Sequence, residues 1–337
     1  MTELLQKLLH GENLSFDEAR EMILWIMSEE AVPVKAAALL ALLQAKGTIP
    51  DEMAGAASAM RERAMKIRAP ENVIDTCSTG GNGISTFNIS TCAAIIAAAA
   101  GAVVAKHGNR SNTRKSGSAE VLEMLGVNIG MGVEGVQQCL DELGLCFCYA
   151  VNHHPAMRFA GPIRRELGVP TVFNLLGPLT NPAGAKRQLI GVPNQALTRT
   201  IAEVLKRLGS KQVLVVHGED GLCELTMSGT TFVAELRDGE IREYTVTPEE
   251  LGLERGDLDA IRITEAEESA ATIRGILAGT EQGPARTIAL MNTAGALVVS
   301  GVVDDLKTGV TLATEAIDSG NAQTILDALV EFTQQAA

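Results

Sequence analysis

Residues 75–91 read DTCSTGGNGISTFNIST and contain three successive patterns. The first residues continue a short β-branched run that predicts a strand, and three glycines between 80 and 83 then interrupt it. Glycine adopts backbone conformations that a Cβ forbids, and it lets N–H groups approach a ligand closely. The apolar run CAAIIAAAAG at 92–101 predicts a helix behind the loop, with 88–91 in its first turn. Because helix N-termini favour negative charge, the stretch predicts a phosphate-binding strand, loop and helix.

Length and composition limit the class of protein. The chain has 337 residues, more than one domain usually holds, so two domains are expected. Hydrophobic residues make up 46% and aromatic residues only 3%, which is typical of aliphatic helices packed on a parallel sheet. The net charge of −13 makes a nucleic-acid or membrane partner unexpected. Neither a long apolar stretch nor a signal-peptide pattern is present, which predicts a cytoplasmic protein.

The six cysteines are scattered, and several lie in apolar runs. Cys146 and Cys148 alternate with Phe147, so in a strand their side chains would share one face. They lack the partners that a zinc knuckle needs. We therefore expect reduced thiols in the core.

The first 66 residues carry helical patterns and no strand pattern. Ser15 and Glu18 fit a capping box at the start of one helix, and Gly47 ends another. Asp51 is expected to cap the helix that follows. We predict four helices in this segment.

From residue 72 onward, short β-branched runs alternate with helical patterns, which favours a mostly parallel sheet wrapped by helices. An Asp-Gly pair at 238–239 predicts an antiparallel hairpin. The segment from Glu265 to the C-terminus predicts three helices, with the apolar run 287–301 buried. The expected parallel strands are VIDT (73–76), AVVAKH (102–107), VNIG (127–130), LCFCYA (145–150), RQLIGV (187–192) and QVLVVHG (212–218).

A basic loop follows the predicted strand at 102–107. Four cations fall between residues 106 and 115 of a chain that is acidic overall. Open α/β sheets bind ligands at the carboxyl ends of their strands, so this loop is expected beside the glycine loop. Small polar residues with Gly108 and Gly117 suit a phosphate cradle, and the alternative is a solvated loop.

Two later clusters suit a carboxylate and a hard cation. Arg164 can present its guanidinium fork to a carboxylate, and the pairs at 177–178 and 181–182 predict a turn-rich loop. Glu224, beyond the predicted strand at 212–218, can coordinate Mg²⁺ together with substrate phosphate oxygens. Taken alone, either side chain is explained as well by exposure to water.

In this order and spacing, the four clusters resemble the anthranilate phosphoribosyltransferase family over nearly the whole chain. The resemblance implies a small helical domain at 1–66, joined by a helical segment near 155–185, and an α/β domain at 70–337 with a mostly parallel central sheet. It implies a homodimer that transfers the phosphoribosyl group of 5-phosphoribosyl 1-pyrophosphate to anthranilate, in the second step of tryptophan biosynthesis. The most specific matches are TFNIST (86–91), KHGNR (106–110), GSAEVLEMLGV (117–127), VFNLLGPLTNP (172–182) and AKRQLIGV (185–192).

The resemblance also implies roles for matching positions. Those for phosphoribosyl pyrophosphate are Ser78, Gly80, Gly81, Asn82, Thr86, Asn88, Ile89, Ser90, Thr91, Lys106, His107, Gly108, Asn109, Arg110, Arg114 and Ser118. Those for anthranilate are Asn109, Arg164, His107, His154, Gly177 and Pro178. Ser90, Glu224 and Cys223 match positions for Mg²⁺, of which the family has two sites. We assign no catalytic base, because the aromatic amine is already a neutral nucleophile.

Four residues depart from the family pattern. Ser78 and Asn82 replace a glycine and an aspartate of the first loop, Cys223 replaces an aspartate, and Arg114 stands where a small residue is usual. Each of the last three changes moves the local charge one unit toward positive. Because Mg²⁺ prefers anionic oxygen, the second metal site is expected to be weakened. Ser78 would be strained only if its φ were positive.

Two interpretations of these departures and one alternative function remain open. Arg114 can partly replace the missing metal charge by contacting pyrophosphate, which would leave an active enzyme. Alternatively, the chain is a relative with an impaired metal site or without catalysis. A pyrimidine nucleoside phosphorylase-like enzyme would share the fold and the phosphate loop.

Overall fold

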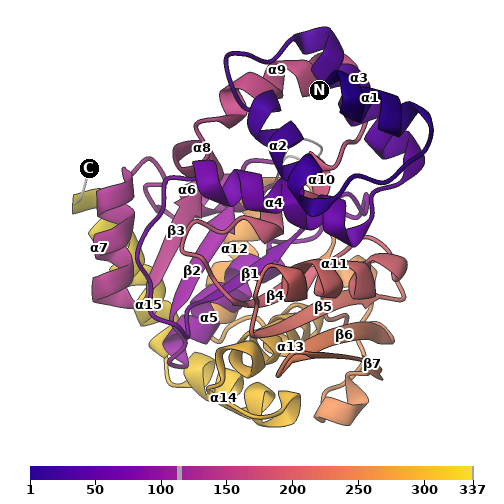
Figure 1. The fold of residues 1–337 in the computed structure, drawn as a ribbon. Helices are drawn as coiled ribbons and strands as arrows, with labels where there is room; N and C mark the ends of the chain where they lie inside the picture. Colours follow the sequence, from indigo (N-terminus) through magenta and orange to yellow (C-terminus); the bar gives the residue numbers. More distant parts are fainter. Residues whose placement is uncertain (112–115, 336–337) are drawn as a thin grey trace.

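The computed structural model describes residues 1–111 and 116–335. These residues form a helical N-terminal domain and a larger α/β domain built on one twisted sheet (Figure 1). The predicted fold class is confirmed.

Residues 1–66, all of them described, contain four helices, as the sequence predicts. Ser15 caps the second helix and Glu18 returns the hydrogen bond, so the capping box is present. The prediction for Asp51 is wrong: the fourth helix begins one residue earlier, at Pro50, because proline already has the φ angle of a first helical position. The helices are α1 (Thr2–Leu9), α2 (Phe16–Ile26), α3 (Pro33–Lys46) and α4 (Pro50–Arg63).

In the described part of the chain, seven strands form one sheet in the order β3-β2-β1-β4-β5-β6-β7. Neighbouring strands from β3 to β5 are parallel, and the predicted hairpin β6–β7 is antiparallel. Its turn has positive φ at Asp238 and Gly239 (53° and 78°), as a tight hairpin requires. The strands are β1 (Ile74–Ser78), β2 (Val104–Gly108), β3 (Leu145–Tyr149), β4 (Arg187–Gly191), β5 (Gln212–Gly218), β6 (Thr231–Arg237) and β7 (Glu240–Val246).

Two predictions about this domain are wrong. Residues 127–130 form a loop instead of a strand, because Asn128 bonds to Thr333 and caps its own turn at Gly130. The described residues 265–335 hold four helices instead of three, because Gly320, at φ 80°, separates the last two. The helices after β1 are α5 (Ile89–Ala99), α6 (Ser118–Met124), α7 (Val133–Leu143), α8 (Ala150–His153), α9 (Met157–Leu167), α10 (Phe173–Leu176), α11 (Ala196–Arg207), α12 (Ala266–Leu277), α13 (Pro284–Ser300), α14 (Leu306–Asp318) and α15 (Asn321–Gln335), with 3-10 helices η1 (Gly177–Leu179), η2 (Glu249–Leu251) and η3 (Leu258–Ile261).

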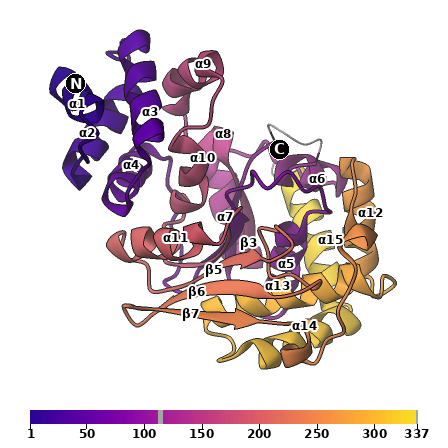
Figure 2. The same ribbon diagram turned by 90° about the vertical axis from the view of Figure 1, so that its right-hand side faces the viewer.

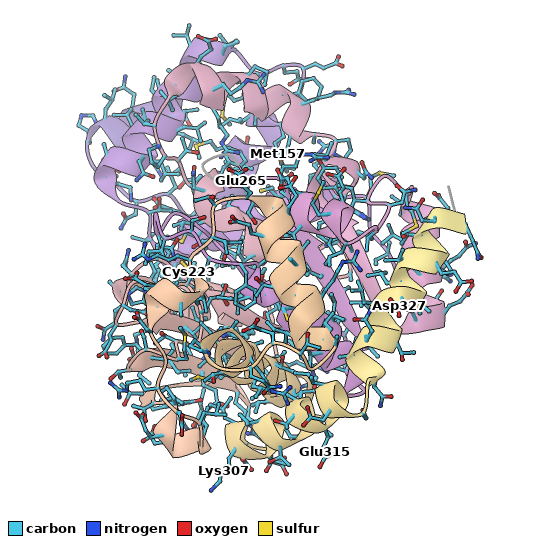
Figure 3. All side chains as sticks on the ribbon, turned by 180° about the vertical axis from the view of Figure 1, so that it is seen from behind. Met157, Cys223, Glu265, Lys307, Glu315 and Asp327 are labelled. Atoms are coloured by element: carbon cyan, nitrogen blue, oxygen red, sulfur yellow. The ribbon has the colours of Figure 1, made fainter. Side chains whose placement is uncertain are left out.

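Both faces of the sheet are covered. α11 lies on one face, and α5 and α13 lie on the other (Figure 2). In β5, Val213 and Val215 pack toward α11, whereas Leu214 and Val216 join the opposite core. This double burial explains why the strand reads as a continuous apolar run. Seen from behind, Lys307, Glu315 and Asp327 project into solvent from α14 and α15 (Figure 3).

Several smaller expectations can be compared with the structure. All six cysteines are buried with free thiols, and the Sγ atoms of Cys146 and Cys148 lie 3.9 Å apart on one face of β3, as predicted. α9 packs against α3, although the two helices are far apart in the sequence (Figures 1 and 2). Among the described helices, none combines the length and the apolar character needed to span a membrane.

Gly55 allows α2 and α4 to approach closely, because a Cβ at this position would lie 2.2 Å from the carbonyl oxygen of Phe16. We expect Gly55→Ala to lower the free energy of unfolding by about 1–3 kcal/mol, measured by urea denaturation. The matched control is Gly135→Ala in α7, whose Cβ would meet Met131 at an ordinary 3.5 Å. That variant should be neutral or gain up to about 1 kcal/mol. Equal effects of the two substitutions would contradict the close approach.

Candidate active site

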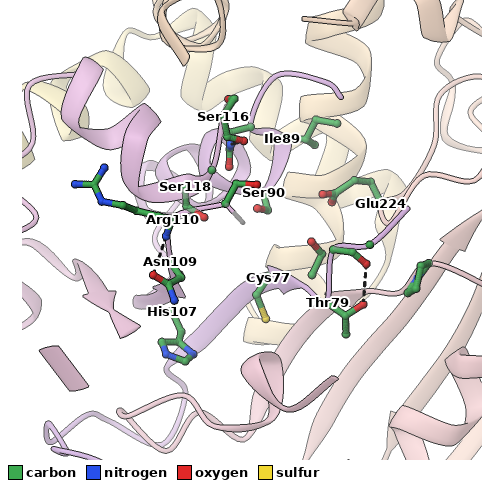
Figure 4. A pocket seen from close by; sticks show the side chains of 18 of the residues that line it. Cys77, Thr79, Ile89, Ser90, His107, Asn109, Arg110, Ser116, Ser118 and Glu224 are labelled. Carbon is green, nitrogen blue, oxygen red and sulfur yellow. Dashed lines mark hydrogen bonds between the residues drawn. The ribbon is translucent and has the colours of Figure 1, made fainter. Parts of the chain in front are cut away.

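A cavity of about 520 Å³ opens at the carboxyl ends of β1 and β2 (Figure 4). β1 lies between β2 and β4, so the chain reverses its direction of travel across the sheet at this point. Open α/β sheets bind ligands at such switch points. Ser90 and Ser118 lie between Glu224 on one side and Asn109 and Arg110 on the other (Figure 4). The lining residues are 77–81, 86–90, 106–111, 116–118, Pro170, Asn174, Leu175, Pro193 and Glu224.

The glycine loop forms one wall of the cavity. Gly80, Gly81 and Gly83 have φ angles of 67°, 85° and 70°, which residues with a Cβ rarely adopt. Ser78 lies in β1 with a negative φ, so the serine causes no backbone strain. The N–H of Thr79 donates to the carbonyl of Gly191 at 3.0 Å, which ties the loop to β4.

The first turn of α5 lies beside this loop. Asn88 precedes the helix, and its side-chain amide donates to the carbonyl of Ser116 at 3.4 Å. The hydroxyl of Thr91 donates to the side-chain oxygen of Asn88 at 3.1 Å, and Thr91 is buried below the cavity. Asn88 therefore joins the helix start to the basic loop.

Lys106 lies at the floor of the cavity with its ammonium group buried. The Nζ atom donates to the carbonyl of Thr76 at 2.6 Å and to the hydroxyl of Ser90 at 3.2 Å. Burial lowers the pKa of Lys106 and raises the pKa of the buried Asp75 carboxyl, and each group opposes the shift of the other. The Nζ atom of Lys106 therefore lies between β1 and the first turn of α5.

Gly108 and Gly117 allow close packing at the two ends of the basic loop. A Cβ at Gly108 would lie 2.7 Å from the ring of Phe147, and one at Gly117 would lie 2.5 Å from the backbone nitrogen of Ser111. The guanidinium of Arg110 pairs with Glu123 at 2.7 Å. Arg114 and Lys115, which the sequence assigns to this loop, lie outside the described residues.

Two neutral histidines contact each other at the opposite wall of the cavity. The Nε2 atoms of His107 and His154 lie 3.2 Å apart, and Nδ1 of His107 donates to the carbonyl of Gly177 at 3.2 Å. Burial is the largest cause that lowers the pKa of His107 to about 4 and the pKa of His154 to about 3. His107 lines the cavity, whereas His154 lies beyond it. The wall is therefore uncharged at neutral pH.

Arg164 reaches this wall through Asn174. Its Nη2 atom donates to the side-chain oxygen of Asn174 at 3.4 Å, and its guanidinium lies 5.2 Å from the ring centre of Phe173. Asn174 lines the cavity, but Arg164 does not. Partial burial lowers the pKa of Arg164, although a guanidinium stays charged at neutral pH.

Two oxygen-bearing side chains that can bind magnesium line the cavity. Ser90 and Glu224 line the same cavity, and one hydroxyl and one carboxylate can hold Mg²⁺ when substrate phosphates complete its shell. Cys223 does not line the cavity; its Sγ atom lies 3.9 Å from the carbonyl of Gly80. In the described ranges, no group of three or more His, Cys, Asp and Glu side chains is arranged to hold a metal.

The structure brings most of the sequence-predicted residues to the cavity. Those that line it are Ser78, Gly80, Gly81, Thr86, Asn88, Ile89, Ser90, Lys106, His107, Gly108, Asn109, Arg110, Ser118 and Glu224. Those that lie outside its lining are Asn82, Thr91, His154, Arg164, Gly177, Pro178 and Cys223. Asn82 accepts a hydrogen bond from the backbone of Ile84 at 3.3 Å.

Sequence reasoning missed some lining residues. Asn174 belongs to the VFNLLGPLTNP segment, and its position next to that turn was a usable signal. Pro170 and Pro193 had no signal in the sequence, because only the tertiary fold brings them to the cavity. The missed residues are Cys77, Thr79, Phe87, Ser116, Pro170, Asn174, Leu175 and Pro193.

The chain is similar to known proteins over its whole length. Residues 2–64 match the family model described as "Glycosyl transferase family, helical bundle domain", and residues 70–323 match "Glycosyl transferase family, a/b domain". The chain is 46% identical over 334 residues to the anthranilate phosphoribosyltransferase of Nitrosomonas europaea, with 98% of each chain covered. It is 47% identical over 335 residues to that of Desulfatibacillum aliphaticivorans, with 99% of each covered.

Solved structures agree with the sequence matches. The anthranilate phosphoribosyltransferase of Thermus thermophilus has a TM-score of 0.93 and 43% identity, with 98% of this chain and 99% of that chain covered. The enzyme of Saccharomyces cerevisiae in complex with PRPP and Mg has a TM-score of 0.90 and 27% identity, with 99% and 98% covered. The matching family models, together with relatives of this identity and coverage, show that the chain belongs to the anthranilate phosphoribosyltransferases of the glycosyl transferase family.

Proposed function

We propose that this chain transfers the phosphoribosyl group of 5-phosphoribosyl 1-pyrophosphate to the amine of anthranilate and releases pyrophosphate, in the second step of tryptophan biosynthesis. One observation supports this most directly. A single cavity joins a positive-φ glycine loop and a helix start on one side to a neutral histidine wall on the other. The first side suits a polyphosphate, and the second suits an aromatic acceptor.

On the phosphate side, the proposed chemistry is stabilisation of a leaving anion. When the bond between C1 and pyrophosphate breaks, positive charge develops on the ribose and negative charge on pyrophosphate. The backbone N–H groups of Gly80, Gly81 and Ser90 on the cavity wall are the proposed donors for that anion, and the buried ammonium of Lys106, which bonds to the Ser90 hydroxyl, would add positive charge. Gly108, Asn109, Arg110 and Ser118 complete the proposed contacts.

On the acceptor side, the proposed chemistry is orientation. Arg164 binds the anthranilate carboxylate with its guanidinium fork, after leaving its bond to Asn174. Asn109, His107, His154, Gly177 and Pro178 form the surrounding wall. The neutral amine then faces C1 and attacks without a strong general base.

Ser90 and Glu224 would hold Mg²⁺, which when bound supplies positive charge next to the departing pyrophosphate. We propose that the second metal site of the family is weakened here, because Asn82 and Cys223 provide no carboxylate. Arg114, which lies outside the described residues, is proposed to contact pyrophosphate in its place.

We also propose an assembly and a location. Residues 1–66 and the segment near 155–185 would form one helical domain, and 70–337 would form the α/β domain. The chain would act as a cytoplasmic homodimer on these two small substrates, with neither nucleic acid nor membrane as a partner. The formal charge of −13 is consistent with this choice of partners.

The metal hypothesis predicts a change in Mg²⁺ dependence. The unmodified chain should turn over, and the double variant Asn82→Asp with Cys223→Asp should gain an additional Mg²⁺-dependent rise in kcat, because two carboxylates are restored. Steady-state kcat measured across a Mg²⁺ titration tests this, with Cys223→Ser as an uncharged control. If turnover is absent until both aspartates are restored, Arg114 does not replace the metal and the chain is an impaired relative.

The proposed carboxylate contact predicts a selective effect of Arg164. We expect Arg164→Ala to raise the KM for anthranilate by roughly 10- to 100-fold, because a charge-assisted hydrogen bond is lost, with little change in the KM for phosphoribosyl pyrophosphate. Arg165→Ala, the exposed neighbour on α9, is the control. Equal changes in both KM values would contradict the assignment.

A nucleoside phosphorylase-like activity is tested separately. Because the acceptor wall suits an aromatic amine, we expect no phosphorolysis of thymidine or uridine at substrate concentrations that saturate anthranilate turnover. Release of free base from either nucleoside would favour the alternative function.

A further inference from the structure

The 3-10 helix η1 (Gly177–Leu179) forms a turn behind His107, and side chains from three different elements bond to its three consecutive carbonyl groups. His107 Nδ1 on β2 donates to the first carbonyl at 3.2 Å. Gln188 Nε2 on β4 donates to the second at 2.7 Å, and Arg61 Nε on α4 donates to the third at 2.6 Å. The turn is therefore tied at each carbonyl, both to the sheet and to the helical domain.

Burying Gln188 at this position costs folding free energy. Its side chain is fully buried, and its Oε1 atom has no hydrogen-bond partner in the described part of the chain. It lies opposite Asp75 in the neighbouring strand, where the Oδ2 atom of that carboxyl also has no partner. A buried oxygen without a partner destabilises the fold. We therefore attribute the role of Gln188 to the hydrogen bond from its side-chain nitrogen to the carbonyl of Pro178.

Burial of the Arg61 guanidinium also costs folding free energy. It is largely buried, and burial lowers its pKa to about 10. Within residues 1–111 and 116–335 it forms no ion pair; besides its bond to the turn, Nη1 donates to the carbonyl of Leu208 at 3.5 Å. A charge buried without an opposite charge is destabilising. The guanidinium thus joins α4 to two backbone segments, the turn at Leu179 and the end of α11 at Leu208.

The third donor to the turn, His107, lines the cavity. His107 lines the cavity and bonds through Nδ1 to the turn, and its backbone N–H donates to the Asp75 carboxylate at 3.0 Å. Arg61 and Gln188 do not line the cavity. If the turn moves, the imidazole of His107 loses the carbonyl that fixes its ring, and the wall behind the acceptor changes shape.

We infer that Arg61 and Gln188 are positioning residues for the aromatic acceptor, because together they hold the 177–179 turn that orients His107. This inference rests on the proposed function, since it assigns the wall to anthranilate. The phosphate side is held by other contacts, chiefly the bonds of Lys106 and the tie between Thr79 and Gly191. Loosening the turn should therefore weaken use of the acceptor and leave use of phosphoribosyl pyrophosphate intact.

The experiment measures both KM values and thermal stability for matched pairs of variants. Gln188→Leu should raise the KM for anthranilate by about 3- to 10-fold, the effect of one neutral hydrogen bond, with the KM for phosphoribosyl pyrophosphate unchanged. Its control is Gln212→Leu, which removes another buried strand glutamine that bonds a distant carbonyl, that of Val298. The control should lose stability without a change in either KM.

For the second residue, Arg61→Met should raise the KM for anthranilate by about 10-fold or more, and Arg61→Lys, which keeps one charged donor, should recover part of that loss. Arg63→Met, exposed on the same helix, is the control. If Arg61→Met does not fold, Gln188→Leu and Arg61→Lys still answer the question.

The outcomes separate the two proposals. Absence of anthranilate turnover by the unmodified chain, and by the variant with both aspartates restored, overturns the proposed function and the positioning role with it. Normal turnover with equal shifts of both KM values, or with lower stability and unchanged KM values, overturns only the positioning role. A selective rise in the KM for anthranilate at both positions supports it.

Discussion

β1 hydrogen-bonds to β2 on one side and to β4 on the other, with both of its faces buried. Because β2 and β4 run parallel to β1, the carboxyl ends of all three strands lie at the same edge of the sheet. The loops that follow these strands therefore meet there. The glycine loop after β1 and the basic loop after β2 therefore lie side by side, although about twenty residues, including α5, separate the two loops in the sequence. The cavity is a consequence of this strand order.

Below the cavity, the same two strands hold a buried pair of opposite charges. Asp75 accepts the backbone N–H of His107, and Lys106 bonds to the carbonyl of Thr76 and to the hydroxyl of Ser90. Burial disfavours each charge alone, so each depends on the other and on its hydrogen bonds. Successive residues of β2 point to opposite faces, so the Lys106 side chain reaches Ser90 of α5 and the His107 side chain reaches Gly177.

The unusual residues Ser78 and Cys223 fit this framework without strain. Ser78 occupies an ordinary strand conformation. Cys223 is packed against β4 so closely that a Cβ at Gly191 would lie 1.6 Å from its carbonyl oxygen. Its backbone is therefore fixed whichever side chain stands there, and replacement of an aspartate by cysteine changes the local charge more than the fold. Neither departure requires a strained backbone in this structure.

Local sequence patterns were sufficient to predict the four N-terminal helices, the β6–β7 hairpin and the glycine loop. These follow from caps, glycines and apolar periodicity within a few residues, where short-range physics is sufficient. Such patterns failed at 127–130, where a buried contact from Asn128 to Thr333 replaces a strand, and at the break before α15. Pro170 and Pro193 reach the cavity, and Arg61 and Gln188 bond to the turn behind His107, through contacts that arise only in the tertiary fold. Most of these contacts join separate elements of the fold, and no local pattern specifies which backbone carbonyl of another element a buried donor will meet.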